Sequence, residues 1–142
     1  MPDIALGEIR DNFAVLDDWE DRYRYVIELG RELAPLDEAF KTEATKVRGC
    51  ASQVWLISRK LEPTADGKAR LGFQGDSDAH IVRGLIAILL AAIDGKAAGD
   101  ILALDLPAIF AELGLKDNLT PQRSNGLASM IQRVKADAAG VA

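Results

Sequence analysis

The stretch AHIVRGLIAILLAAIDG, residues 79–95, decides the fold of this chain of 142 residues. Apolar side chains occupy almost every position in it, so a helix formed here has no continuous polar face and must be buried. Gly95 is a typical helix end, and Asp76, Ser77 and Asp78 just upstream are typical helix caps. We therefore expect a buried helix that begins near residue 79 and covers one face of a sheet.

The sheet is expected directly upstream of this helix. Residues 53–61 contain the unbroken β-favouring run VWLI between polar residues. Residues 63–68 follow, and they contain an Asp-Gly pair that is typical of a turn. Residues 70–74 then place Leu71 and Phe73 on one face of a second strand. The two strands are predicted to form an antiparallel hairpin.

Helical patterns flank this central part on both sides. Apolar residues recur at helical spacing near residues 9–16, and a second helix is expected from Asp17 or Asp18 to Pro35. Residues 36–47 are predicted to be a loop. After Gly95 we expect short helices at 98–104 and 106–113, and a final helix that Thr120 and Pro121 begin. The apolar face of that helix comprises Leu127, Met130, Ile131 and Val134. The prediction is an α+β fold with helices packed on a small antiparallel sheet, in a single domain spanning residues 1–142.

Composition excludes several functional classes. The formal net charge of −5 and the absence of a Lys/Arg cluster argue against nucleic acid as a partner. The longest strongly apolar stretch, residues 85–93, is about half of what a membrane span needs. Residues 1–10 are acidic and lack an apolar core, so no signal peptide is expected. With one cysteine, an internal disulfide and a multi-cysteine metal or cluster site are ruled out. A reduced thiol and a cytoplasmic location are expected.

Cys50 is that cysteine and the first candidate for chemistry. A lone cysteine is commonly a small, inert, buried hydrophobe. Here small residues surround it, with Gly49 before it and Ala51 and Ser52 after it. They suit a tight turn at the junction between the loop and the first strand, and such a position favours a reactive thiol over a buried one.

Four other residues are candidates for a role at the site. Arg123 is expected in the first turn of a helix, where a cation is unfavourable by about 0.3–1 kcal/mol, which favours a site or structural role. Asp76 and Asp78 have the spacing of metal ligands, but helix capping is the more common use. His80, the only histidine, could form a dyad with Cys50. That dyad would make the chain a thiol hydrolase, whereas a non-catalytic adaptor would need neither residue.

Three motifs, spread along the chain in the same order as in the family, resemble those of the SufE family. They are RGCASQVWL at 48–56, FQGDSDA at 73–79 followed by IVRGLIA at 81–87, and LTPQRSNGL at 119–127. Trp19 and residues 23–30 are also similar to the N-terminal helix of that family. The motifs are also similar to those of the close paralogue CsdE, which serves a second desulfurase, so both assignments stay open.

The resemblance implies a sulfur carrier in iron–sulfur cluster assembly, and a sulfur-transfer partner rather than a stand-alone enzyme. By motif position, Cys50 accepts persulfide sulfur from a SufS-type cysteine desulfurase, stimulates that enzyme, and delivers the sulfur to a SufBCD-type scaffold complex. The implied fold resembles that of the NifU and IscU scaffold proteins. No metal and no cofactor is implied for this chain, since the pyridoxal phosphate belongs to the desulfurase.

Asp76 and Arg123 are expected to support Cys50. Because the hairpin returns toward the start of its first strand, Asp76 should lie near Cys50 by chain geometry. Arg123 is placed there by the resemblance alone, where it could pair with Asp76 or Asp78 or offset the charge of a persulfide. The sulfur of the resting protein is expected to be shielded, because an exposed persulfide would be lost to other thiols.

Overall fold

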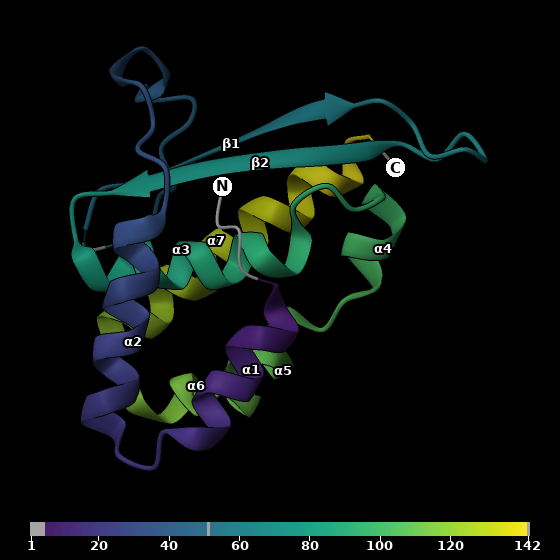
Figure 1. Ribbon diagram of the computed structural model, residues 1–142. Coiled ribbons are helices and arrows are strands. Elements are labelled where there is room, and N and C mark those ends of the chain that lie inside the picture. Colours follow the sequence, from purple (N-terminus) through teal and green to yellow (C-terminus); the bar gives the residue numbers. More distant parts are fainter. Residues whose placement is uncertain (1–4, 51, 142) are drawn as a thin grey trace.

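The computed structural model describes residues 5–50 and 52–141, which form seven α-helices, one 3-10 helix and one two-stranded sheet. The elements are α1 (Leu6–Val15), α2 (Trp19–Glu32), η1 (Glu38–Phe40), β1 (Val54–Leu61), β2 (Arg70–Ser77), α3 (His80–Ile93), α4 (Ala98–Ala103), α5 (Leu106–Glu112), α6 (Leu115–Asn118) and α7 (Pro121–Ala139). In Figure 1 the hairpin lies across the top, α3 and α7 run beneath it, and α1, α5 and α6 lie further below. This is the predicted α+β architecture.

The hairpin is antiparallel, and its second strand is longer than predicted. Val54 pairs with Ser77 and Trp55 with Asp76, so β2 continues three residues beyond its expected end at Gln74. The helix caps expected at residues 76–78 are therefore wrong, because strand pairing has taken up two of them. The N-cap of α3 is Ala79, which makes no side-chain capping bond.

The core forms around α3, as its sequence predicts. Leu85, Ile88 and Leu89 are at most 1% exposed. α2 packs directly on α3, where a Cβ on Gly84 would overlap the backbone oxygen of Val26. Only glycine permits this close approach of the two helices.

The predicted starts of α2 and α7 are confirmed in their atomic detail. Asp18 accepts a hydrogen bond from the amide of Glu20 at 3.1 Å and begins α2. Thr120 accepts from the amide of Arg123 at 3.3 Å, and Pro121 is the first residue of α7. Both short helices after Gly95 are present, and α6 is an additional element that the sequence did not indicate.

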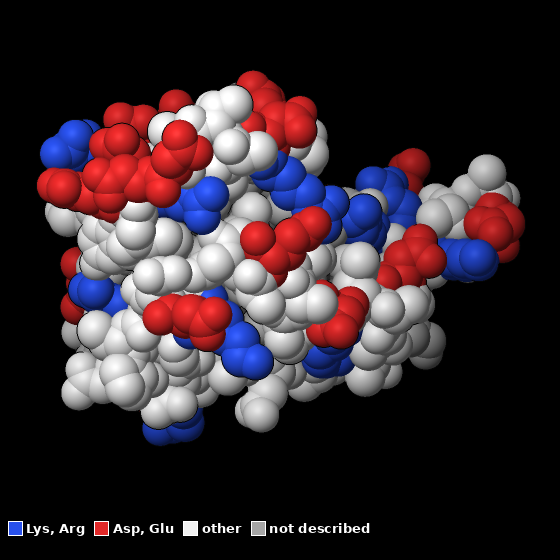
Figure 2. All heavy atoms as spheres, turned by 90° about the horizontal axis from the view of Figure 1, so that it is seen from below, with Lys and Arg blue, Asp and Glu red and all other residues white. Residues whose placement is uncertain are grey.

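The surface carries both signs of charge. Figure 2, a view from below, shows acidic and basic groups interspersed over most of this face, with acidic groups gathered at one edge. The turn of the hairpin projects beyond the body of the molecule in both views (Figures 1 and 2). Among the described residues, no helix is long and apolar enough to cross a membrane.

Candidate functional site

Cys50 lies on a short loop whose base is closed by hydrogen bonds. The amide of Val47 donates to the carbonyl oxygen of Val54 at 2.8 Å, and the amide of Leu56 donates to that of Thr45 at 2.9 Å. Residues 45–47 therefore pair with the start of β1, and the described residues 48–50 and 52–53 belong to the loop between them. Gly49 has φ +87°, a left-handed conformation that favours glycine. The predicted position of Cys50 at a junction between loop and strand is confirmed.

The thiol of Cys50 is half-buried against α7. It donates a long hydrogen bond to the carbonyl oxygen of Gly126, with 3.6 Å between sulfur and oxygen. A cavity of about 20 Å³ adjoins it, between Val54, Val82 and Leu85 on one side and α7 on the other. Such a volume accommodates one water-sized atom. A Cβ on Gly126 would lie 3.4 Å from the sulfur, so this glycine keeps the space open.

Burial changes the acid–base behaviour of the thiol. Desolvation raises the pKa of Cys50, because a thiolate loses more hydration than a thiol does. At neutral pH the group is thus protonated in this conformation, and a thiol is a far weaker nucleophile than a thiolate. The closed loop consequently protects the sulfur but does not activate it.

Arg123 is brought to Cys50, as expected from its motif. It lines the same cavity, and its guanidinium donates to the hydroxyl of Tyr23 in α2 at 2.8 Å. It forms no ion pair with Asp76, whose cationic partners are Arg83 and Lys41. The suggested pairing of Arg123 with Asp76 is therefore wrong, whereas a role in offsetting persulfide charge stays a prediction.

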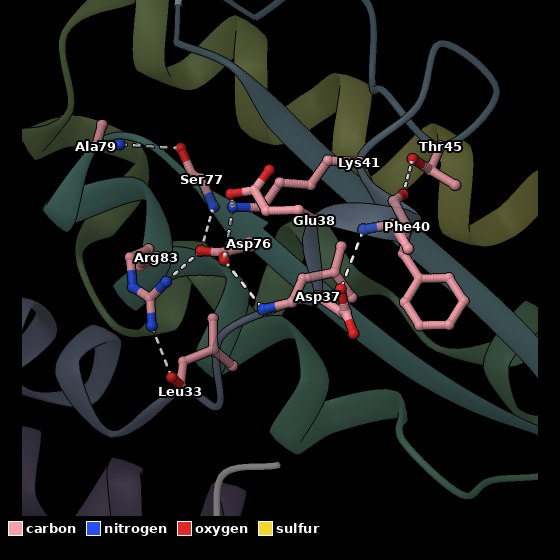
Figure 3. A network of polar contacts seen from close by, with 12 residues as sticks. Leu33, Asp37, Glu38, Phe40, Lys41, Thr45, Asp76, Ser77, Ala79 and Arg83 are labelled. Atoms are coloured by element: carbon pink, nitrogen blue, oxygen red, sulfur yellow. Dashed lines mark hydrogen bonds and ion pairs between the residues drawn. The ribbon is translucent and has the colours of Figure 1, made fainter.

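Asp76 is the centre of a buried polar network (Figure 3). Only 3% of this residue is exposed. Its carboxylate accepts from the amides of Leu36 at 3.0 Å and Ser77 at 2.8 Å, and it is paired with Arg83 and, at 3.5 Å, with Lys41. Burial alone would raise the pKa of Asp76, but the two amides and the two cations outweigh it and lower the pKa.

This network holds the segment that precedes the Cys50 loop. Arg83 also donates to the carbonyl oxygens of Gly30 at 3.0 Å and Leu33 at 2.6 Å, at the end of α2. Lys41 lies 5.0 Å from the centre of the Trp55 ring, on the outer face of the sheet. Residues 36–41 therefore lead from the end of α2 to the face opposite α3 and α7, and Figure 1 shows the chain after α2 rising above the hairpin.

The expected position of Asp76 beside Cys50 is wrong. Asp76 pairs with Trp55, and successive side chains of a strand point to opposite faces. Val54, which lines the Cys50 cavity, lies on the inner face, so Asp76 lies on the outer one. The carboxylate near the loop is that of Asp78, which accepts from the amide of Gln53 at 3.0 Å.

His80 and the aspartates give no support to the other predicted chemistries. His80 is exposed at the start of α3 and does not line the Cys50 cavity. Among the described residues, no three His, Cys, Asp or Glu side chains are grouped so as to hold a metal ion. Neither the hydrolase dyad nor the D-x-D metal site has a geometric basis in this part of the chain.

Fold and site together define a class of protein: a helix-covered two-stranded sheet that carries one half-buried thiol on a loop with a closed base. The family model that matches residues 7–138 is SufE, described as an Fe-S metabolism associated domain. The chain belongs to the SufE family.

Relatives with known sequences support this assignment over nearly the whole chain. An uncharacterised SufE-like protein of Rhizobium meliloti is 52% identical over 136 residues, which cover 96% of each chain. Sulfur acceptor protein CsdE of Escherichia coli is 40% identical over 133 residues, covering 94% of this chain and 87% of its own. A hypothetical protein from Thermus thermophilus, solved in solution, has a TM-score of 0.69 at 23% identity. The match covers 96% of this chain and 94% of the Thermus thermophilus chain. At this sequence identity the similarity shows that the two proteins share a fold and nothing more.

Proposed function

We propose that this chain is a sulfur acceptor that receives sulfane sulfur on Cys50 from a pyridoxal-phosphate-dependent cysteine desulfurase of the SufS type. The observation that carries the proposal is the half-buried thiol of Cys50 beside a cavity of about 20 Å³ in a member of the SufE family. The proposal extends to stimulation of the desulfurase, to delivery of the sulfur to a SufBCD-type scaffold, and to a cytoplasmic location.

The reaction that we propose needs only one sulfur nucleophile on this chain. The thiolate of Cys50 attacks the outer sulfur of the desulfurase persulfide and forms a new sulfur–sulfur bond. The old sulfur–sulfur bond breaks, and its electron pair leaves with the inner sulfur of the donor as a thiolate. The proton of the donor persulfide stays on the transferred sulfur, so the step involves no net oxidation and no cofactor on the acceptor.

The lack of a second cysteine suits this chemistry. A neighbouring thiol would attack the Cys50 persulfide, expel sulfide and close a disulfide. The chain contains one cysteine in total. A Cys50 persulfide is therefore safe from attack within its own chain and is exposed only to thiols that reach it from outside.

The loop must open for the transfer. In the closed conformation the thiol is protonated and adjoins a cavity that admits about one atom. Arg123 lines that cavity and donates to the hydroxyl of Tyr23, which supports the proposal that its charge offsets a persulfide anion when the loop closes again. Asp76 supports the site indirectly, because it holds the segment that leads to the loop.

Mass spectrometry tests the proposal directly. The protein is incubated with a SufS-type desulfurase, pyridoxal phosphate and cysteine, and we expect a mass gain of one or more sulfur atoms on the peptide that contains Cys50. Cys50→Ser is the control, since a hydroxyl cannot form a persulfide, and it should neither gain mass nor stimulate the desulfurase. Desulfurase stimulation by the Ser variant, or no added sulfur on Cys50 in the wild type, would refute the proposal.

A further inference from the structure

One residue outside the SufE motifs contacts the base of the Cys50 loop. Arg133 lies two turns of α7 beyond Gly126, and its guanidinium donates to the carbonyl oxygen of Ala44 at 2.8 Å and to that of Lys46 at 3.4 Å. Asp137, one turn further along α7, pairs with Arg133 at 3.5 Å and orients it. The side chain of Arg133 is 29% exposed, so these bonds are partly shielded from water.

These contacts lie next to the backbone bonds that close the loop. Ala44 and Lys46 flank Thr45, whose carbonyl oxygen accepts from the amide of Leu56. The following residue, Val47, donates its amide to Val54. Arg133 therefore attaches to α7 the short segment from which the Cys50 loop departs. Among the described residues, the tip of the loop has no comparable ionic contact with α7. Instead, Gly49 lies close to Ser129 of α7, and the thiol of Cys50 donates the long hydrogen bond to Gly126.

We propose that Arg133 is a positioning residue for Cys50: it fixes residues 44–47, the base of the loop, to α7, so that Cys50 can move while this base stays in place. This role of Arg133 rests on the proposed function, because a fixed loop base matters for sulfur transfer only if Cys50 moves to accept sulfur. A fixed base returns Cys50 to the same cavity after each opening. Without this contact, the backbone hydrogen bonds between residues 45–47 and β1 would break more often when the tip of the loop opens.

The test uses the full chain and three variants. Arg133→Met retains the apolar stem but removes all donors, and Arg133→Lys retains one charged donor group. Arg10→Met is the matched control, because Arg10 forms an exposed pair with Glu112 at 3.0 Å, far from the loop in sequence and on other elements. Site-resolved hydrogen exchange is followed at the amides of Val47 and Leu56, with the amides of α3 as the internal reference.

In Arg133→Met we expect exchange at Val47 and Leu56 to be about tenfold faster, a factor that matches loss of a hydrogen bond from a charged donor. The α3 amides should not change. Alkylation of Cys50 in the free protein should accelerate by a similar factor, Arg133→Lys should fall between Arg133→Met and wild type, and Arg10→Met should match wild type. Equal acceleration of all amides would show that Arg133 acts only on global stability. That result, or unchanged exchange at Val47 and Leu56, would overturn the proposal.

A second measurement addresses the transfer itself. With a desulfurase present, Arg133→Met should lower the maximal rate of sulfur uptake while the half-saturating acceptor concentration stays unchanged, since the altered contact positions the reacting atom. The exchange experiments need no partner, so they separate the two hypotheses. If Cys50 took no sulfur, the proposed function would fail while the exchange result could still hold.

Discussion

Gly126 lines the cavity beside the sulfur of Cys50, and its lack of a side chain leaves that cavity open. Gly126→Ala therefore tests whether a persulfide on Cys50 is sheltered there. A Cβ at this position would lie 3.4 Å from the sulfur of Cys50, close to an ordinary contact distance, so the thiol form of the variant should still close. The cavity, however, measures about 20 Å³, and the new methyl group would occupy the space that the second sulfur needs.

The size of the effect follows from the cost of overpacking. Inserting one extra methyl-sized group into a packed site costs about 1–3 kcal/mol. Because 1.36 kcal/mol corresponds to a factor of ten, the open fraction of the persulfide form should rise about 5- to 150-fold. In the thiol form the same change should stabilise α7 by about 0.5–1 kcal/mol, since alanine is the better helix former. Greater stability together with a more labile persulfide is a combination that simple damage to the fold would not produce.

The assay loads Cys50 chemically with a small persulfide donor, so that no desulfurase is needed, and then follows sulfide release by excess dithiothreitol. Gly99→Ala is the matched control, because Gly99 is also helical and a Cβ there would meet nothing within 4 Å. We expect faster release from Gly126→Ala alone. Release at the wild-type rate would show that the persulfide is not held in this cavity, whatever the fate of the thiol.

Three further predictions follow from burial and charge. Burial raises the pKa of Cys50, so its alkylation by a bulky reagent should titrate at a higher pH in the native protein than in the denatured protein. Alkylation should be faster with a desulfurase bound, and equal rates would contradict opening of the loop. Asp76→Asn should cost about 3–5 kcal/mol by chemical denaturation, against less than about 1 kcal/mol for the exposed Asp21→Asn. Because the pKa of Asp76 is lowered, its contribution is complete above about pH 5 and is lost as the pH falls below about 4; a pH-independent difference would argue against the ionic network. Leu85→Ala should cost about 2–5 kcal/mol, while Leu102→Ala, at a position 39% exposed, should change stability by less than about 0.5 kcal/mol.

Local signals were sufficient where a single segment decides its own structure. The apolar run of α3 required burial, and Thr120 with Pro121 marked the start of α7 because a hydroxyl cap and a proline satisfy the first turn of a helix. The loop position of Cys50 was likewise predictable from its small neighbours. In each of these cases the decisive contacts lie within a few residues of one another.

Long-range contacts account for the failures. The last residues of β2 look like helix caps until the pairing of Val54 with Ser77 is known, and that register depends on the whole hairpin. One signal was available: Arg83 is a lone cation in an otherwise apolar helix, which implies a buried anion nearby. Asp76, seven residues earlier, is that anion. The position of Gly126 beside Cys50 had no local signal, because it depends on how α7 packs against the loop.

The geometry of the loop limits how the partner can approach. Val47 is held to β1, and Cys50 is three residues further along, so the Cα of Cys50 stays within about 10–11 Å of that of Val47 in any open conformation. A long swinging movement is thereby excluded as long as the base remains paired. The same burial that would protect a persulfide also raises the pKa of the thiol, so the proposed uptake of sulfur would take place with the loop open. Under the proposed function, the donor sulfur of the desulfurase would therefore reach Cys50 at the loop and the first turns of α7, where Gln122 and Arg123 line the cavity beside Cys50.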